Sequence, residues 1–327
     1  MRLLLIDGHY YLYRSFHAIG NLRNSKGEPT NAIYGFIQAV RRMIADLRPD
    51  LGAIIWDAGL SARRVALQPS YKQNRPAMPQ PLRRQESLLK ELCPYLGFSS
   101  LSLPQVEADD LLASYTEAAV IGGIEVNIAT SDKDLFQLVR PGVFIYATSK
   151  ADSTGKGFSL LGEEFVLRKW GVAPCLIGEV LALTGDVVDN IPGINGVGPK
   201  TAALLVQAYG GITGLLENLD RVKNKTLRAK LEANRSQIIK NLGIVRLDLH
   251  IPLPSPLANL HIQPRYAELI HTLERYEFGL LSRAIEREAA KEKGDTEVIS
   301  ITQGWLFKDV QSMQPELGKQ RQFATFL

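Results

Sequence analysis

The chain has 327 residues, of which 45% are hydrophobic and 22% are charged, a composition typical of a globular protein long enough to form two domains. Its net charge of +4 allows an anionic partner without requiring one. No stretch approaches the roughly 20 apolar residues of a membrane-spanning helix. The apolar run 3–6 stops at Asp7 and is too short for a signal peptide. We therefore expect a cytoplasmic protein with no membrane partner.

Cys93 and Cys175 are too few for a disulfide framework or a zinc site. Both lie in apolar surroundings, so we expect buried thiols in a reducing compartment. The charged residues are segregated along the chain: positive charge concentrates in 63–84 and 200–240, while acids recur at the ends of predicted strands.

The first half of the chain alternates between predicted strands and predicted helices. Short apolar runs predict strands over 2–6, 53–56, 98–101, 125–129 and 143–146. Helices are predicted over 31–47, 85–95 and 135–139, and a further helix follows the acidic stretch 105–110. This alternation predicts an α/β fold with a mostly parallel central sheet flanked by helices.

Acidic residues stand where several of these strands end. Asp7 follows the first strand, Asp57 the second, and Asp132 and Asp134 follow the strand over 125–129. One acid after a strand is a common turn or capping residue, but capping does not explain acids after every major strand. Because ligands bind beyond the carboxyl ends of strands in such sheets, we expect these acids to converge on one edge.

Three further acids, Glu107, Asp109 and Asp110, open the next helix. Acids at a helix N-terminus can be explained by the helix dipole, which gains roughly 0.3–1 kcal/mol from each. A third neighbouring carboxylate is harder to explain, because like charges disfavour ionisation unless a cation neutralises them. The rest of the chain favours a cation site over helix capping alone.

Beyond about residue 160 the pattern becomes helical. Helices are predicted over 163–170, 175–183, 199–209, 227–245, 266–276 and 278–288. The Gly-, Ser- and Lys-rich segment 150–157 predicts the boundary between a domain at 1–160 and a helical domain at 161–290. Residues 291–327 are weakly patterned and predict a C-terminal tail.

A glycine-rich turn joins two of these helices. Gly193, Gly196 and Gly198 lead into a helix that begins with Pro199 and Lys200, so residues 176–209 predict a helix–hairpin–helix. Backbone N–H groups at such a turn can cradle a phosphate, and the hairpin would grip a nucleic-acid backbone without reading its sequence. A plain turn between helices is the alternative. No preceding strand supports a dinucleotide-binding loop.

Asp186 and Asp189 precede this hairpin and complete a set of nine acids. The set is Asp7, Asp57, Glu107, Asp109, Asp110, Asp132, Asp134, Asp186 and Asp189. No histidine or cysteine is expected among them, and an all-oxygen site selects hard cations such as Mg²⁺ or Mn²⁺. Nine acids exceed the needs of one ion and suit two ions. Two ions can activate a water and stabilise the leaving oxygen of a phosphoryl displacement.

The basic segment 63–84 is too polar to pack and too long for a simple connection. Its Tyr71, Lys72 and Arg75 could neutralise phosphates and admit a single strand opposite the acids, although a solvated surface would show the same pattern. Near the N-terminus, Tyr13 could stack on a base and Arg14 could pair with a phosphate. Tyr13 is equally compatible with a position in the core.

Together these motifs resemble the 5′-nuclease family, which comprises flap endonucleases and the 5′→3′ exonuclease domains of bacterial family A DNA polymerases. The resemblance covers residues 1–285 and rests on four motifs. They are Leu5-Ile6-Asp7-Gly8, Glu107-Ala108-Asp109-Asp110, Thr130-Ser131-Asp132-Lys133-Asp134 and the stretch from Gly185 to Gly193. The resemblance implies an α/β nuclease domain with a helical arch at about 60–90, joined to a helix–three-turn–helix domain that grips duplex DNA. No polymerase motif is present, so we expect a free-standing enzyme.

The resemblance also implies roles for individual residues. The first ion would be served by Asp7, Asp57, Glu107, Asp109 and Asp110, and the second by Asp132, Asp134, Asp186 and Asp189. The matched catalytic residues are Lys72 and Arg75, at the scissile phosphate, and Arg14, at a phosphate. The candidate DNA-binding residues are Tyr13, Tyr71, Arg63, Gly193, Gly196, Gly198, Lys200 and Thr201. Family members can also hold K⁺ on the carbonyls of the hairpin. Three positions depart from the family pattern. Ala62 stands where an aromatic residue is frequent, Trp56 where Phe is usual, and Val188 where Ser is frequent.

We therefore predict a metal-dependent, structure-specific 5′ nuclease that acts on DNA with 5′ flaps, nicks or free 5′ ends, and on RNA–DNA primers, in replication or repair. A monomer is expected, with a DNA polymerase as a candidate partner. One alternative is a structure-specific DNA-binding protein with weak or no nuclease activity, in which a broken acid set is expected. Another is a PIN-like ribonuclease, which would lack the hairpin and the long arch.

Overall fold

The computed structural model describes residues 1–148 and 158–291, so the predicted boundary at 150–157 and almost all of the predicted tail lie outside the described residues. The chain divides into two compact units, Met1–Arg265 and Tyr266–Leu327. The first unit contains a six-stranded sheet. The described part of the second contains helix α12 (Tyr266–Arg275) and a helical stretch over 279–291.

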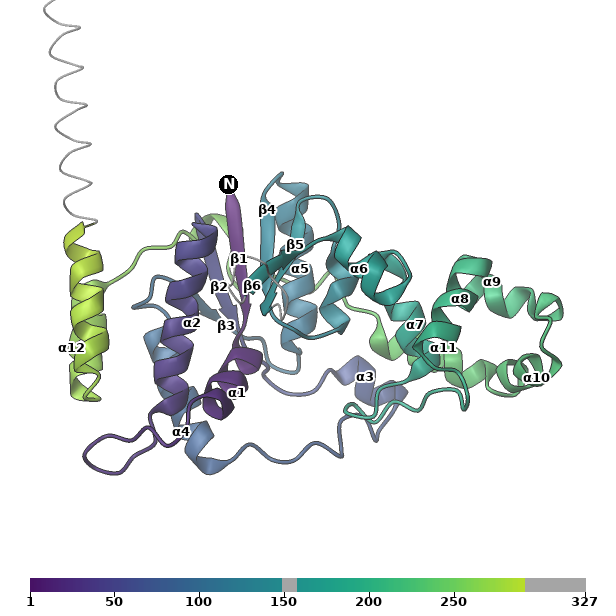
Figure 1. Cartoon of the computed structure of the whole chain (residues 1–327), viewed down its shortest axis with the longest axis horizontal. Helices are drawn as coiled ribbons and strands as arrows, with labels where there is room; N and C mark the ends of the chain where they lie inside the picture. The colour runs from purple at the N-terminus through teal and green to yellow at the C-terminus, as the bar shows by residue number, and fades with distance from the viewer. Residues whose placement is uncertain (149–157, 292–327) are drawn as a thin grey trace, which may run out of the picture. The chain divides into compact units, whose positions relative to one another are not determined.

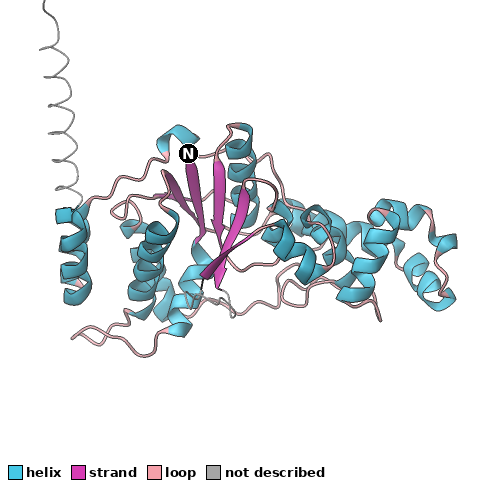
Figure 2. Ribbon diagram, turned by 45° about the horizontal axis from the view of Figure 1, so that its top comes forward, coloured by secondary structure: helices cyan, strands magenta, loops and turns pink. Residues whose placement is uncertain are grey.

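The sheet has the strand order β3-β2-β1-β4-β5-β6 (Figure 2, magenta). Its strands are β1 (Arg2–Asp7), β2 (Leu51–Ile55), β3 (Ser99–Leu101), β4 (Glu125–Ala129), β5 (Val143–Thr148) and β6 (Phe158–Leu161). Every neighbouring pair is parallel except β5 with β6, which is antiparallel. The predicted α/β class with a mostly parallel sheet is confirmed, although the sequence pattern does not predict β6.

Strand β1 lies inside the sheet, between β2 and β4. Its side chains from Leu3 to Ile6 have no exposed surface, as expected for a parallel strand that is covered on both faces. From β1 the chain continues through β2 and β3 on one side, and through β4 and β5 on the other. The carboxyl ends of β1 and β4 therefore flank the point where the winding direction changes, which is where such sheets bind their ligands.

Helices cover both faces of the sheet (Figure 1). They are α1 (Gly8–Ala18), α2 (Asn31–Leu47), α4 (Gln80–Leu92) and α5 (Ala108–Ile121), whereas α3 (Ala62–Leu67) packs against the later helix α11 (Arg235–Val245). Helices α1, α2 and α4 pack against one another on one side. Helix α5 lies on the other side, where it shares a buried cluster with Leu3 and Leu5.

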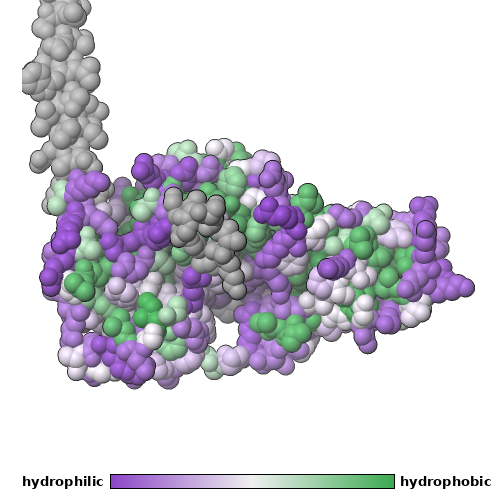
Figure 3. All heavy atoms as spheres, viewed as in Figure 1, coloured by the Kyte–Doolittle hydropathy of each residue, from purple (hydrophilic) through white to green (hydrophobic). Residues whose placement is uncertain are grey.

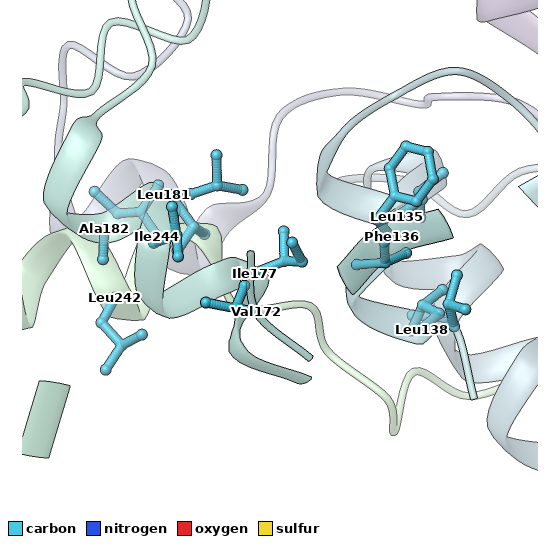
Figure 4. Packing of buried hydrophobic residues seen from close by; sticks show 14 of the residues in the cluster. Leu135, Phe136, Leu138, Val172, Ile177, Leu181, Ala182, Leu242 and Ile244 are labelled. Carbon is cyan, nitrogen blue, oxygen red and sulfur yellow. The ribbon is translucent and has the colours of Figure 1, made fainter. Parts of the chain in front are cut away.

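After β6 the first unit is helical. Its elements are α6 (Glu163–Trp170), η2 (Pro174–Leu176), α7 (Ile177–Thr184), α8 (Pro199–Tyr209), α9 (Ile212–Glu217), η3 (Leu219–Arg221), α10 (Lys225–Ala233), α11 (Arg235–Val245) and η4 (Leu257–Asn259). The buried cluster continues from the 3-10 helix η1 (Asp134–Leu138) to α7 and α11 (Figure 4). Leu135 and Phe136 thus share one core with Ile177 and Leu181. This packing fixes the acids after β4 relative to those that follow α7.

Three predictions need correction. The single helix predicted over 227–245 is two helices that meet at Asn234, whose side chain donates to the carbonyl of Lys230; asparagine favours such local bonds at helix ends. The helix predicted from residue 85 begins at Gln80, because Pro81 fits a first helical turn. Cys93 is buried as expected, but Cys175 is exposed.

We next consider whether any described helix could span a membrane. Within residues 1–148 and 158–291, no helix combines the length and the apolar character needed to cross a bilayer. The face seen in Figure 3 mixes hydrophilic and hydrophobic residues over the α/β and the helical parts of the first unit.

Candidate active site

Asp7 lies at the junction of β1 and α1. One carboxylate oxygen caps α1 by accepting from the backbone N–H of Tyr10 at 2.9 Å, and the other accepts from the hydroxyl of Thr130 at 2.9 Å. A Cβ on Gly8 would lie 2.5 Å from the ring of Trp56, so this turn requires glycine. These contacts fix Asp7 between the ends of β1 and β4, with only 7% of its surface exposed.

Helix α5 brings the acidic motif to the same edge of the sheet. Asp57, which follows β2, accepts a hydrogen bond from the backbone N–H of Ala108 at 2.8 Å. Burial raises the pKa of Asp109 well above its usual value, and the charges of Asp132 and Asp7 raise it further. Burial likewise raises the pKa of Asp7 to about 7. Carboxyl groups that oppose one another's ionisation in this way become fully charged when a cation neutralises them.

A cavity of about 690 Å³ opens over these acids. Its lining includes the carboxylates Asp7, Asp57, Asp109 and Asp132 and the cationic residues Arg14, Lys72 and Arg75. The acids come from the ends of β1, β2 and β4 and from the first turn of α5, so the strand-end acids do converge on one edge. Tyr13 also lines the cavity and is half-buried, which favours the predicted site position over a position in the core.

A second acidic cluster consists of Asp134, Asp186 and Asp189, whose ligand oxygens lie within 4.8 Å of one another. The loop that carries Asp186 is closed by an antiparallel bridge to Ile191. Burial, together with the charge of Asp132, raises the pKa of Asp134 to about 8. Asp134 Oδ1 is buried and has no hydrogen-bond partner among the described residues. A buried carboxylate oxygen without a donor is suited to a hard cation.

The segment between α3 and α4 (Figure 1) carries two cationic residues whose side chains contact these acids. Lys72 Nζ lies 2.7 Å from Glu107 and 3.9 Å from Asp189, and Arg75 Nε donates to Asp189 at 3.1 Å. Lys72 has a φ of 56°, which is rare for a non-glycine residue, and its N–H donates to the carbonyl of Asp189 at 3.1 Å. Backbone strain of this kind clusters at functional sites.

Two other residues in this part of the chain, Tyr71 and Arg63, form hydrogen bonds within the protein. Tyr71 is 3% exposed and its hydroxyl donates to Glu107 at 3.0 Å. Because its ring is buried, the structure argues against the predicted contact of Tyr71 with DNA. Arg63 donates to the backbone carbonyls of Gly243 and Arg246, so its guanidinium lies at the end of α11.

Arg64, which the sequence analysis does not single out, is buried between α3, α5 and the end of α11. It donates to both oxygens of Asp110, at 2.6 and 2.7 Å, and to the carbonyl of Ile244 at 2.8 Å. Its Nη1 also lies 3.3 Å from Glu107. Because Arg64 occupies both carboxylate oxygens, the geometry disfavours the predicted place of Asp110 among the ligands of the first ion.

A histidine stands among the acids, contrary to the sequence expectation. His9 Nδ1 lies 3.1 Å from Asp57 and Nε2 lies 3.1 Å from Glu86. Burial lowers the pKa of His9, but the hydrogen bonds to the two carboxylates outweigh it and raise the pKa to about 9. Both ring nitrogens of His9 are occupied by protein partners, since the backbone N–H of Asp57 also lies 3.2 Å from Nδ1, so the candidate ligands remain oxygens. The only sequence signal for His9 is its place two residues after Asp7.

The predicted hairpin lies between α7 and α8. A Cβ on Gly193 would clash with the carbonyl oxygen of Thr184, and Gly196 has a φ of 83°. The exposed residues are Gly193, Gly196, Gly198 and Lys200, with Thr201 half-buried beside them. Lys230 of α10 donates to the carbonyl of Asn195, at the tip of the turn, at 3.0 Å. The hairpin thus presents backbone groups and lysines at the surface, and its contact with phosphate stays a prediction.

Two family models match consecutive parts of the chain. The 5′-3′ exonuclease N-terminal resolvase-like domain matches residues 2–171, and the 5′-3′ exonuclease C-terminal SAM fold matches residues 172–268. A 5′-3′ exonuclease of Aquifex aeolicus is 39% identical over 230 residues, which are 70% of this chain and 77% of that protein. The thermostable DNA polymerase I of Thermus thermophilus is 36% identical over 280 residues, 86% of this chain. The chain spans 32% of the length of that polymerase.

Solved structures show the same fold at low sequence identity. The T5 D15 protein co-crystallised with metal ions has a TM-score of 0.63 and 18% identity, with coverage of 88% of this chain and 99% of that one. The catalytic core of Rad2 in complex with DNA substrate has a TM-score of 0.59 and 16% identity, with coverage of 87% and 90%.

A mostly parallel sheet with carboxylates gathered at its strand ends, followed by a helical region with a hairpin, defines the class of metal-dependent nucleases. The chain belongs to the 5′-3′ exonuclease family. The predicted family and fold class are confirmed, whereas the roles of the individual site residues and the domain limits stay predictions.

Proposed function

We propose that the protein is a structure-specific 5′ nuclease that hydrolyses DNA phosphodiesters at 5′ flaps, nicks and free 5′ ends with two divalent cations. The observation that carries this proposal is the cavity in which acids from separate strands adjoin Lys72 and Arg75. Groups that bind cations and groups that bind phosphate are the two halves of a phosphodiesterase site. The Aquifex exonuclease and the T5 flap endonuclease, whose structure was solved with DNA and metal ions, support this substrate class.

The acids fit Mg²⁺ or Mn²⁺, because their donor atoms are carboxylate oxygens and Asp134 Oδ1 has no hydrogen-bond partner within residues 1–148 and 158–291. The first ion would be held by Asp7, Asp57, Asp109 and Asp132, and the second by Asp134, Asp186 and Asp189. Asp132 joins the first group here because it lines the cavity. Glu107 and Asp110 would act through their basic neighbours. Two such ions would activate a water molecule as the nucleophile and would stabilise the negative charge on the leaving oxygen.

Lys72 and Arg75 would hold the scissile phosphate. The oxygen of water forms a bond to phosphorus, the P–O3′ bond breaks, and the products carry a 5′-phosphate and a 3′-hydroxyl. The two cationic side chains would exchange their contacts with Glu107 and Asp189 for the non-bridging oxygens of the phosphate. Their attraction strengthens as negative charge builds up in the transition state, which lowers the barrier.

The remaining candidates would hold the rest of the DNA. Arg14, 5.5 Å from the ring centroid of Phe158, would bind a neighbouring phosphate, and Tyr13 would stack on an unpaired base. The exposed hairpin residues Gly196, Gly198 and Lys200, with the half-buried Thr201, would bind phosphates of the duplex. The hairpin carbonyls are candidate ligands for K⁺, and Lys230 already satisfies one of them.

The cellular role follows from the family. We propose removal of RNA–DNA primers or repair of DNA, with a DNA polymerase as partner, and a monomer in the cytoplasm. The relatives named DNA polymerase I, in which the matching segment belongs to a longer protein, support the polymerase link.

An end-labelled 5′-flap duplex with MgCl₂ tests the proposal. We expect the wild type to cut near the junction, and we expect Asp132→Ala and Lys72→Ala to lose cleavage while duplex binding persists. Lys26→Ala, on an exposed loop, is the control and should cut like the wild type. Tight flap binding without cleavage in Mg²⁺ or Mn²⁺ would overturn the proposal in favour of a DNA-binding protein.

A further inference from the structure

One imidazole joins helix α4 to the acidic edge of the sheet. His9, the second residue of α1, places Nδ1 3.1 Å from Asp57 Oδ2 and Nε2 3.1 Å from Glu86 Oε1. The side chains of His9 and Glu86 are only 17% and 15% exposed, so water competes little for these bonds. Neither His9 nor Glu86 has a part in the mechanism above.

The carboxylate of Asp57 is held from two sides. Its Oδ1 accepts from the backbone N–H of Ala108 at the start of α5, and its Oδ2 adjoins His9. The imidazole is in turn packed edge-on against the Trp56 ring, with 5.5 Å between ring centroids and an interplanar angle of 90°. The position of His9 is therefore restricted by a neighbouring ring as well as by two carboxylates.

Glu86 is likewise fixed on α4. Lys90, one turn later, places Nζ 2.6 Å from Glu86 and 5.2 Å from the centroid of the Trp56 ring. The hydrogen bond from His9, reinforced by Lys90, lowers the pKa of Glu86 to about 2. Helix α4 packs through buried leucines, among them Leu82 and Leu89, so its packing alone does not require a carboxylate at residue 86.

We propose that His9 is a positioning residue that fixes the Asp57 carboxylate for cation binding, and that Glu86 holds His9 in place. The proposal rests on the proposed function, in which Asp57 is a ligand of the first ion. Helix α4 directly follows the segment that carries Lys72 and Arg75. The chain Glu86–His9–Asp57 therefore ties the end of that segment to the cation site.

Removal of Glu86 should weaken cation binding because His9 loses the contact that holds it against Asp57. The Glu86–His9 contact is one charged interaction, so its loss should lower the cation affinity about threefold to tenfold. An effect that requires His9 as intermediary must shrink when His9 is absent.

The test measures Mn²⁺ binding to the full chain without DNA, by the loss of the free-ion electron paramagnetic resonance signal. Glu86→Gln should bind Mn²⁺ about threefold to tenfold more weakly than the wild type. In a His9→Gln background, Glu86→Gln should change the Mn²⁺ affinity by less than about 1.5-fold. The two substitutions would then be non-additive, as expected for residues that act together. Glu91→Gln, an exposed glutamate on the same helix, is the matched control and should leave the affinity unchanged.

The outcomes separate this proposal from the proposed function. An unchanged affinity in Glu86→Gln, or an equal effect with and without His9, would overturn the positioning role. If Asp57→Asn binds Mn²⁺ as well as the wild type does, then Asp57 is no ligand and the assignment of the first ion fails. Thermal unfolding of each variant identifies any loss of affinity that comes from a misfolded protein.

Discussion

Arg64 and Asp110 form a buried bidentate ion pair, with the two guanidinium nitrogens 2.6 and 2.7 Å from the two carboxylate oxygens. Asp110 Oδ1 also accepts from the backbone N–H of Asp248 at 2.9 Å. The pair joins α3, α5 and the chain that leaves α11, so it connects the acidic helix to the helical region of the first unit. It belongs to the framework of the site rather than to the cavity lining.

We expect Arg64→Ala to destabilise the protein by roughly 3–5 kcal/mol, because it leaves Asp110 charged, buried and unpaired. The double variant Arg64→Met/Asp110→Leu should recover much of this loss, since it removes both charges and retains volume. Urea unfolding with EDTA present measures both effects. Arg63→Ala, the exposed neighbour that donates to backbone carbonyls only, should cost much less. Equal losses at the two positions would contradict the importance of the buried pair.

We expect Lys72→Gln to lower the maximal rate of flap cleavage about 10²- to 10³-fold, because one charged donor to the transition state is lost. The dissociation constant of the flap duplex, measured with Ca²⁺ in place of Mg²⁺, should change by less than about threefold, since binding involves many phosphates. Lys26→Gln serves as the charge-matched control. A fall in rate that is fully explained by weaker DNA binding would assign Lys72 to binding alone.

The contribution of Glu86 to stability should depend on pH. Its pKa is lowered to about 2, chiefly by the hydrogen bond from His9, so the folded state favours the ionised carboxylate. The stabilisation is therefore present above its ordinary pKa of 4.5 and is lost as the pH falls toward about 2. At neutral pH we expect the free energy of unfolding of the wild type to exceed that of Glu86→Gln by on the order of 1 kcal/mol, because Glu86 is partly exposed. Unfolding of both proteins in EDTA should show this gap narrowing from about pH 5 to about pH 3. A gap of constant size would mean that the charge is not involved.

Lys200 should contribute to DNA binding through one phosphate contact. We expect Lys200→Ala to weaken binding of a duplex regardless of its sequence, and to reduce the slope of log affinity against log salt by about 1. Fluorescence anisotropy over a series of KCl concentrations measures both quantities. Lys26→Ala should leave the slope unchanged. A weakened affinity with an unaltered slope would remove Lys200 from the phosphate contacts.

Much of this protein could be predicted from local patterns. The apolar runs predicted the strands β1 and β4, the 3.6-residue spacing predicted α2 over Asn31–Leu47, and acids after strands predicted one acidic edge. Each of these features is a property of a single element and its ends, so the amino-acid order is sufficient to reveal it. The same patterns carried the resemblance to the 5′-nuclease family.

Only the tertiary structure decided which partner each charged or polar side chain has. Arg64 and Asp110 are 46 positions apart, and His9 and Glu86 are 77 apart. No periodicity relates such positions, because their contact depends on how separate elements pack. The same packing buried Tyr71 against Glu107 and set Asp110 apart from the cavity. A sequence determines which carboxylates can gather at an edge, and the packing of helices on the sheet determines which of them remain open to a cation.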